Sequence, residues 1–108
     1  MTLSDLKTAL NATGLKFAHF AWSKAPAGDY GVYAEEGSAD LEANNVHIEK
    51  GTTGYIDYFT RDDSGTPKKT IEAALHGLGI AWRLNSVQYE NDTGYIHYEW
   101  TWGYYGDL

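Results

Sequence analysis

Cysteine is absent from the 108-residue chain, and proline occurs only twice. Without thiols the chain has no disulfide framework and no thiolate chemistry. No apolar run approaches the roughly 18 residues that a membrane-spanning helix needs, and the first residues do not have the pattern of a signal peptide. We therefore expect no membrane partner.

Positive charge is also scarce. Lysine and arginine together number 8, against 15 aspartates and glutamates, so the formal net charge is −7. A surface that binds phosphates needs clustered basic side chains, and only Lys68 and Lys69 adjoin each other, so the sequence predicts repulsion from nucleic acid. The chain is instead rich in hydrophobic (43%) and aromatic (15%) residues. That composition is typical of one folded domain, here residues 1–108.

A nearly identical hexapeptide occurs twice, as TGYIDY at residues 53–58 and TGYIHY at residues 93–98. Before each copy comes a run of alternating polar and apolar residues, at 46–49 and at 87–90. A short break rich in Gly, Asn or Asp separates that run from the hexapeptide. This arrangement predicts two β-hairpins. Because alternate strand residues share a face, one side of the last strand is strongly apolar and is expected in the core: Ile96, Tyr98, Trp100 and Trp102.

The remaining segments predict two helices and two further strands. Residues 2–13 form a helix capped by Thr2 and Asp5, and a second helix is capped by Thr66. The apolar stripe of that second helix is Ile71, Ala74, Leu75 and Leu78. Strands are expected at 17–22 and 30–35, with a polar, irregular loop at 36–45. The predicted fold class is α+β, a single mainly antiparallel sheet of hairpins with two α-helices packed on one face.

The other sheet face combines aromatic and charged residues, and such a face is often covered by another subunit. Its members are Tyr55, Asp57, Phe59, Tyr95, His97 and Glu99. His47, His97 and Asp57 could converge on a metal ion, but histidines on strands more often pack across strands. Asp57 and Glu99 could form a catalytic carboxylate pair, although an acidic surface is the favoured interpretation.

Motifs for covalent catalysis or phosphate binding are not found. No serine lies in a G-x-S-x-G sequence, and the glycine-rich residues 51–54 lack the lysine and helix of a P-loop. Trp82, Trp100 and Trp102 could line a ligand groove, but the core is favoured for Trp100 and Trp102. We expect no catalytic residue, cofactor or metal.

Taken together, several short motifs resemble the small tail terminator (tail completion) proteins of long-tailed bacteriophages and prophages. The resemblance covers most of residues 3–102, with Asn44 at a position where the family often has Asp. In chain order, the motifs are Ala25-Pro26 in a loop, Val32-Tyr33 in a strand, Ala43-Asn44-Asn45, the strand Ile56-Asp57-Tyr58-Phe59-Thr60, the helix 71–78, the acidic turn 89–92 and the aromatic strand 96–100.

This resemblance implies an α+β fold and a structural virion protein without enzyme activity. It also implies self-association into a hexameric ring that caps the tail tube and joins it to the head connector, with DNA passing through without specific binding. The protein would be found in the virion tail, and in the host cytoplasm during assembly. The alternatives are another phage neck or tail protein, and a small ligand- or peptide-binding module that uses the aromatic sheet face.

Candidate partner-interface residues lie in the polar loop, on the mixed sheet face and near the last strand. Tyrosine suits such contacts because it brings a large area and a polar tip at low entropic cost. The candidates are Glu36, Ser38, Asp40, Glu42, Asn44, Tyr55, Asp57, Tyr95, His97, Tyr104 and Tyr105.

Overall fold

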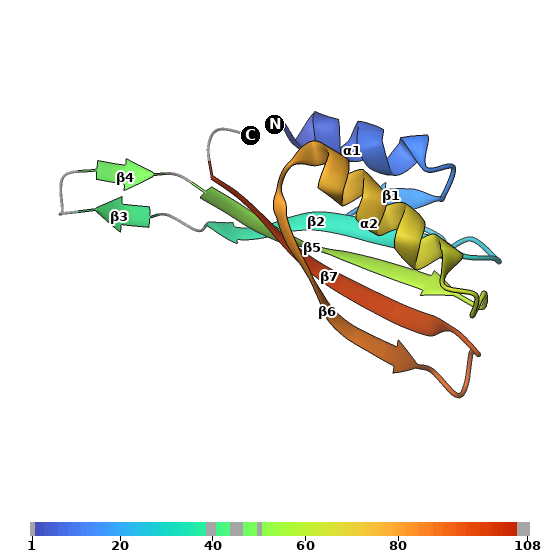
Figure 1. Ribbon diagram of the computed structural model, residues 1–108. Coiled ribbons are helices and arrows are strands. Elements are labelled where there is room, and N and C mark those ends of the chain that lie inside the picture. The colour runs from blue at the N-terminus through green and yellow to red at the C-terminus, as the bar shows by residue number, and fades with distance from the viewer. Residues whose placement is uncertain (1, 39–40, 44–46, 50, 106–108) are drawn as a thin grey trace.

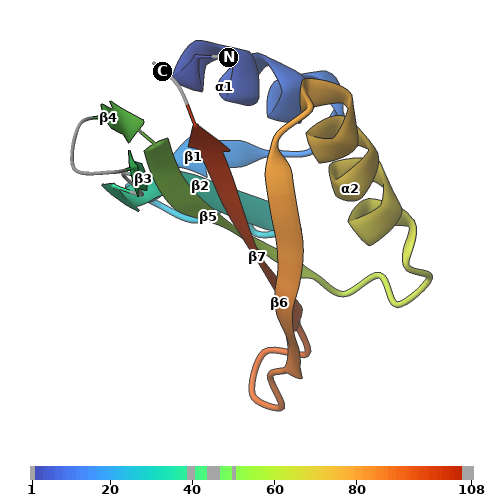
Figure 2. The ribbon, with the colours of Figure 1, turned by 60° about the vertical axis from the view of Figure 1, so that its left-hand side comes forward.

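The computed structural model describes residues 2–38, 41–43, 47–49 and 51–105. Its elements are α1 (Leu3–Ala12), β1 (Phe17–His19), β2 (Tyr30–Ser38), β3 (Leu41–Ala43), β4 (His47–Glu49), β5 (Gly51–Thr60), α2 (Thr66–Leu78), β6 (Ala81–Tyr89) and β7 (Ile96–Tyr105). A five-stranded sheet has the order β1-β2-β5-β7-β6, with β1 parallel to β2 and the other neighbours antiparallel. Both helices lie on one side of it (Figures 1 and 2). The predicted α+β fold is confirmed.

Helix α1 begins at the predicted capping box. The backbone N–H of Asp5 donates to the Thr2 hydroxyl at 3.1 Å, and the Thr2 N–H donates to the Asp5 carboxylate at 2.8 Å. These bonds satisfy donors that a helix N-terminus leaves unpaired. Leu6 and Leu10, one turn apart, are fully buried against the sheet cluster.

The N-cap of α2 lies one residue before the predicted cap, Thr66. The N-cap is Gly65, with φ of +83°, and Thr66 is already helical. The cap shifts because the Ser64 hydroxyl accepts the Thr66 N–H at 3.2 Å, and only glycine readily adopts the left-handed turn between them. The predicted stripe is confirmed, since Ile71 and Leu75 are fully buried.

The core lies between the helices and the sheet. Ile56, Trp100 and Trp102 are 2% exposed or less, as predicted for the tryptophans. The Trp100 indole N–H donates to the Glu72 carboxylate of α2 at 3.0 Å, so the ring is fixed as well as buried. β6 and β7 form the predicted second hairpin, closed by a turn at residues 91–93.

The predicted first hairpin is wrong. β4 pairs with β3, and β5 runs unbroken from Gly51 to Thr60 between β2 and β7. The glycines that suggested a turn have another role, because Gly54 lies in the strand beneath the Trp102 ring, where any side chain would collide. A glycine in a strand often marks such a close approach.

The irregular loop predicted at 36–45 is also wrong. β2 continues to Ser38 through a bulge between Glu35 and Gly37, and residues 41–43 pair with 47–49. The β3–β4 pair projects beyond the end of the main sheet (Figure 1). Asp40 and Asn44 lie outside the described residues.

The strand predicted at 17–22 ends early, at His19. Phe20 has φ of +67°, a left-handed conformation that stops the strand and is rare for a bulky residue. The Phe20 N–H still donates to the Tyr33 carbonyl at 2.9 Å, so the chain turns away from the sheet edge at a fixed point.

Candidate functional site

The sheet face opposite the helices, here termed the open face, carries the mixed set of side chains predicted from the sequence. Strand register places Asp57 between Val32 of β2 and Glu99 of β7, and Phe59 between Tyr30 and His97. Cross-strand partners of this kind share a face and contact each other. The open face consists of Tyr30, Val32, Tyr55, Asp57, Phe59, Arg83, His97, Glu99 and Thr101.

Stacked rings fill one end of the open face. The Phe59 ring stacks on His97 with centroids 4.2 Å apart and on Tyr30 at 4.9 Å. Tyr95 meets Tyr30 edge-on at 5.8 Å, and the Arg61 guanidinium lies 4.0 Å from the centre of the Tyr95 ring. Such contacts fix ring orientation beyond simple burial of apolar area.

Tyr95 anchors the loop between β1 and β2. It is only 7% exposed, and its hydroxyl donates to the Gly28 carbonyl at 2.9 Å. Asp29 in the same loop accepts hydrogen bonds from the Thr60 hydroxyl and the Arg61 N–H. Tyr95 therefore shapes the surface beside it while presenting little area of its own.

Asp57 and His97 form a bonded pair at the centre of the face. The His97 Nε2 lies 2.8 Å from the Asp57 Oδ1, and both side chains are about one-fifth exposed. Burial raises the pKa of the Asp57 carboxyl, the hydrogen bond from His97 lowers it, and the charges of Glu99 and Glu36 raise it, with a net upward shift. The Glu99 carboxylate accepts a hydrogen bond from Asn85 at 2.6 Å.

The raised pKa of Asp57 predicts a specific pH dependence. A carboxyl whose folded pKa exceeds its ordinary 3.8 binds a proton more readily in the folded state, so its stabilising effect is lost as pH rises through the folded pKa. The free energy of unfolding of the wild type, minus that of Asp57→Asn, should fall as pH rises from about 4 to 7.

Urea unfolding across this pH range tests the expectation, and Asp62→Asn is the matched control. Hydrogen bonds from Ser64 lower the pKa of Asp62. The stabilising effect of Asp62 is therefore lost only below about pH 4, and the corresponding difference for Asp62 should stay nearly level between pH 4 and 7. A flat or rising difference for Asp57 would show that burial does not dominate its environment.

Three adjoining depressions cross the open face. One of about 350 Å³, here termed the aromatic groove, is lined by Phe20, Ala21, Trp22, Ala25, Tyr30, Val32, Tyr55, Asp57 and Phe59. The next, of about 390 Å³, shares Tyr55 and Asp57 with it and adds Glu36, Asn85, Glu99 and Thr101. The third, of about 460 Å³, shares Glu36 and Thr101 with the second and reaches β6. Volumes of this size fit parts of another molecule.

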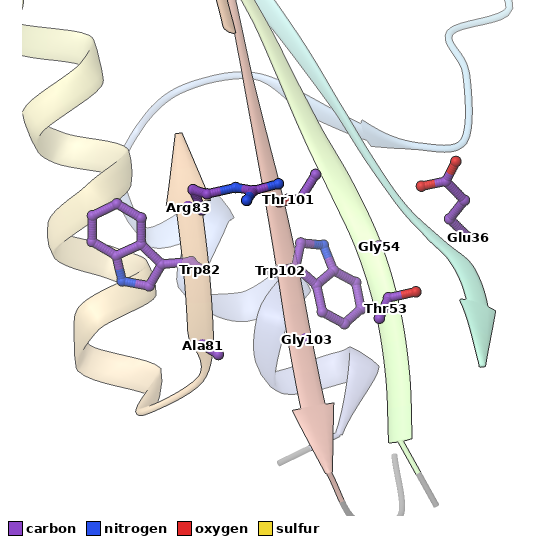
Figure 3. A pocket seen from close by; sticks show the side chains of 9 residues that line it. All are labelled: Glu36, Thr53, Gly54, Ala81, Trp82, Arg83, Thr101, Trp102 and Gly103. Carbon is purple, nitrogen blue, oxygen red and sulfur yellow. The ribbon is translucent and has the colours of Figure 1, made fainter. Parts of the chain in front are cut away.

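The third depression contains Arg83, the one lysine or arginine of the open face. In Figure 3 the Arg83 guanidinium extends from β6 across β7 toward Thr101, while Glu36 lies on the far side of β5. Strands β2, β5, β6 and β7 contain no other lysine or arginine. Within the described part of the chain, Arg83 forms no ion pair, although Asp57 and Glu99 lie on the same face and Glu36 lines the same depression.

The candidate interface residues are only partly brought together. Glu36, Tyr55 and Asp57 line one depression, with His97 beside Asp57. Tyr104 is half-buried near α1 and α2, apart from this set. Ser38 ends β2, Glu42 lies in β3 and Tyr105 ends β7, where only the backbone is described.

Sequence reasoning missed Phe20, Trp22 and Arg83 as members of the surface. Arg83 could have been noticed as the sole lysine or arginine in the predicted strands. The loop aromatics had no such signal, because their position depends on the left-handed turn at Phe20.

Neither a metal site nor a membrane-spanning helix is found among the described residues. Among residues 2–38, 41–43, 47–49 and 51–105, no three His, Asp or Glu side chains are grouped as metal ligands are. His47, which was considered as a metal ligand together with His97 and Asp57, lies in β4, where only the backbone is described. In the same part of the chain, neither helix has the length and apolarity needed to cross a membrane.

Comparison with known proteins gives a likeness in structure alone. No family model matches the sequence, and no curated protein matches it. A solved chain described as "Virion of native gene transfer agent (GTA) particle" superposes with a TM-score of 0.59 at 12% sequence identity. The match covers 95% of this chain and 89% of that one, so the two share a fold over nearly their whole lengths.

Proposed function

We propose that this protein is a structural component of a phage-like virion, specifically a tail terminator that forms a ring of six. The main support is structural similarity: over 95% of its length this chain shares the fold of a chain from a gene transfer agent virion. The sequence motifs that resemble tail terminators add the finer assignment. The ring would cap the tail tube and join it to the head connector.

The charge of the chain supports this role. Six copies at −7 each would carry a formal charge of −42. DNA that passes through a ring is held less when the ring carries like charge, because binding depends on the neutralisation of phosphates by lysine and arginine. DNA would therefore pass without specific binding.

The open face is suited to contact rather than to catalysis. Its two carboxylates are held by neighbouring side chains, with Asp57 bonded to His97 and Glu99 to Asn85. We propose that the protein is not an enzyme and needs no cofactor. Its location would be the virion tail, after assembly in the host cytoplasm.

The aromatic groove favours a second candidate, a small ligand- or peptide-binding module. It holds five aromatic rings and one carboxylate in about 350 Å³, a combination that also suits a small cationic ligand. A monomer that binds such a ligand would support this alternative over the ring.

Light scattering coupled to size exclusion, followed by negative-stain imaging, tests the ring. The terminator predicts a species of about 72 kDa, six times the 12.0 kDa of one chain, and ring-shaped particles. An unrelated acidic protein of similar size serves as the control for anomalous elution. A 12.0 kDa species at every concentration, alone and with purified tail tubes, would contradict the proposed role.

A further inference from the structure

The exposed apolar side chains lie at the two opposite edges of the sheet. Within the described residues, the exposed large hydrophobic side chains are Phe20 (55%), Val87 (52%) and Tyr89 (64%). Phe20 follows β1 at one edge, and Val87 and Tyr89 belong to β6 at the other. The end of the β6–β7 hairpin extends past α2, which leaves that part of β6 uncovered (Figure 2).

The two edges also differ in charge and chemistry. The β6 edge carries Arg83, which is exposed and forms no ion pair with any described residue. The chain that follows β1 lines the aromatic groove with Phe20, Ala21 and Trp22, and the groove runs inward over β2 to the Asp57 carboxylate of β5. Aromatic faces and a carboxylate together are the usual partners of a guanidinium, which stacks on rings and binds carboxylates through its planar donors.

Arg83 and the groove lie in the same rows of the sheet. Arg83 is opposite Thr101, Thr101 is opposite Tyr55, and Tyr55 is opposite Ala34. Directly opposed residues point to the same face, so Arg83 projects on the face that holds the groove, level with Tyr55. If a second copy were placed with its β1 edge beside β6, and its sheet continued the first, its aromatic groove would lie level with Arg83.

We propose that neighbouring copies in the ring join head to tail, with the β6 edge of one against the β1 edge of the next, and that Arg83 of one copy enters the aromatic groove of its neighbour at Phe20 and Trp22, the rings that follow β1. The inference rests on the proposed function and names the surfaces that would build the ring. Joining unlike surfaces by a repeated rotation closes a ring, whereas joining like surfaces stops at a dimer. Two β6 edges together would oppose Arg83 to Arg83 and leave both grooves empty.

Two variants each remove one side of this contact. Arg83→Glu reverses the charge at the β6 edge, and Phe20→Gly removes the exposed ring at the groove with a residue that accepts the positive φ. Each variant should raise the concentration for half-assembly at least about tenfold, as loss of a contacted charge or ring does at interfaces. Lys69→Glu, the same charge change on an exposed site of α2, should assemble as the wild type does.

Mixing the two variants gives the decisive measurement. The intact β6 edge of Phe20→Gly should bind the intact groove of Arg83→Glu, so two 12.0 kDa monomers give a species of about 24 kDa by light scattering and nothing larger. Unaltered thermal unfolding of both variants confirms that they fold. If the wild type forms a ring and both variants form it equally well, the proposed surfaces are wrong and the ring remains. If the wild type stays monomeric, both the ring and these surfaces fail.

Discussion

Trp100→Ala is expected to lower the free energy of unfolding by about 3–5 kcal/mol, the usual effect of deleting a large aromatic from a core. Trp100 is fully buried on β7 and stacks on Tyr98 with centroids 5.7 Å apart. Its N–H also donates to Glu72, so truncation leaves both a cavity and an unpaired carboxylate oxygen. Urea unfolding followed by far-UV circular dichroism measures the loss.

Two further variants separate the causes. Trp100→Phe keeps most of the packing but lacks the indole N–H, so its loss should be smaller than that of Trp100→Ala. Val87→Ala, on the neighbouring strand but 52% exposed, should change stability by no more than about 0.5 kcal/mol. A melting temperature for Trp100→Ala within a degree or two of the wild type would refute the assignment of this face to the core.

Gly54→Ala is expected to lower the free energy of unfolding by about 3 kcal/mol, although it adds only one methyl group. A Cβ at this position would collide with the Ala34 carbonyl and with the Trp102 ring. The carbonyl belongs to a paired strand and the ring is 2% exposed, so neither can move cheaply. Overpacking of this kind usually destabilises by about 1–3 kcal/mol, and the backbone partner places this case at the upper end.

Gly77→Ala is the matched control. Gly77 lies in α2, is exposed, and has no atom near the position of an added Cβ. Alanine in a helix interior is favoured over glycine by about 0.5–1 kcal/mol, so this variant should be more stable than the wild type. The same substitution is thus expected to have opposite signs at two positions. Equal effects at Gly54 and Gly77 would contradict the close packing of β5 under Trp102.

The sequence correctly predicted those elements whose ends are determined by residues close together in the chain. The α1 cap needs only Thr2 and Asp5, three residues apart. The β6–β7 hairpin needs only its short turn and an alternating pattern on either side. In these cases the residues that decide the structure are neighbours in sequence, and both predictions are confirmed.

The two TGY copies show where local reasoning stops. Gly94 has φ of +76° and turns the chain, whereas Gly54 lies in an extended strand because Trp102 packs on it. The sequence around the two glycines is nearly the same. What distinguishes Gly54, in a strand, from Gly94, in a turn, is the Trp102 ring packed on Gly54. That partner lies 48 positions away from Gly54, beyond any local pattern.

The sequence predicted the part of the candidate site that lies on strands, but not the part that lies in the loop after β1. Tyr55, Asp57 and His97 follow from alternation along β5 and β7, and the structure brings them together. Phe20 and Trp22 join them only because the chain leaves β1 in a left-handed turn, and the Trp22 N–H then donates to the Gly31 carbonyl at 2.9 Å. No sequence signal marks such a turn at phenylalanine.

The position of β7 affects how the chain folds during synthesis. β7 follows every other strand in sequence, yet it lies inside the sheet, between β5 and β6. Until residues 96–105 leave the ribosome, β5 has no partner on one side and α2 has no Trp100 to cover. Long-range pairing of this kind is slow and leaves strand edges exposed in the interval. The nascent chain should therefore reach its native fold only after translation has passed β7, in one late step.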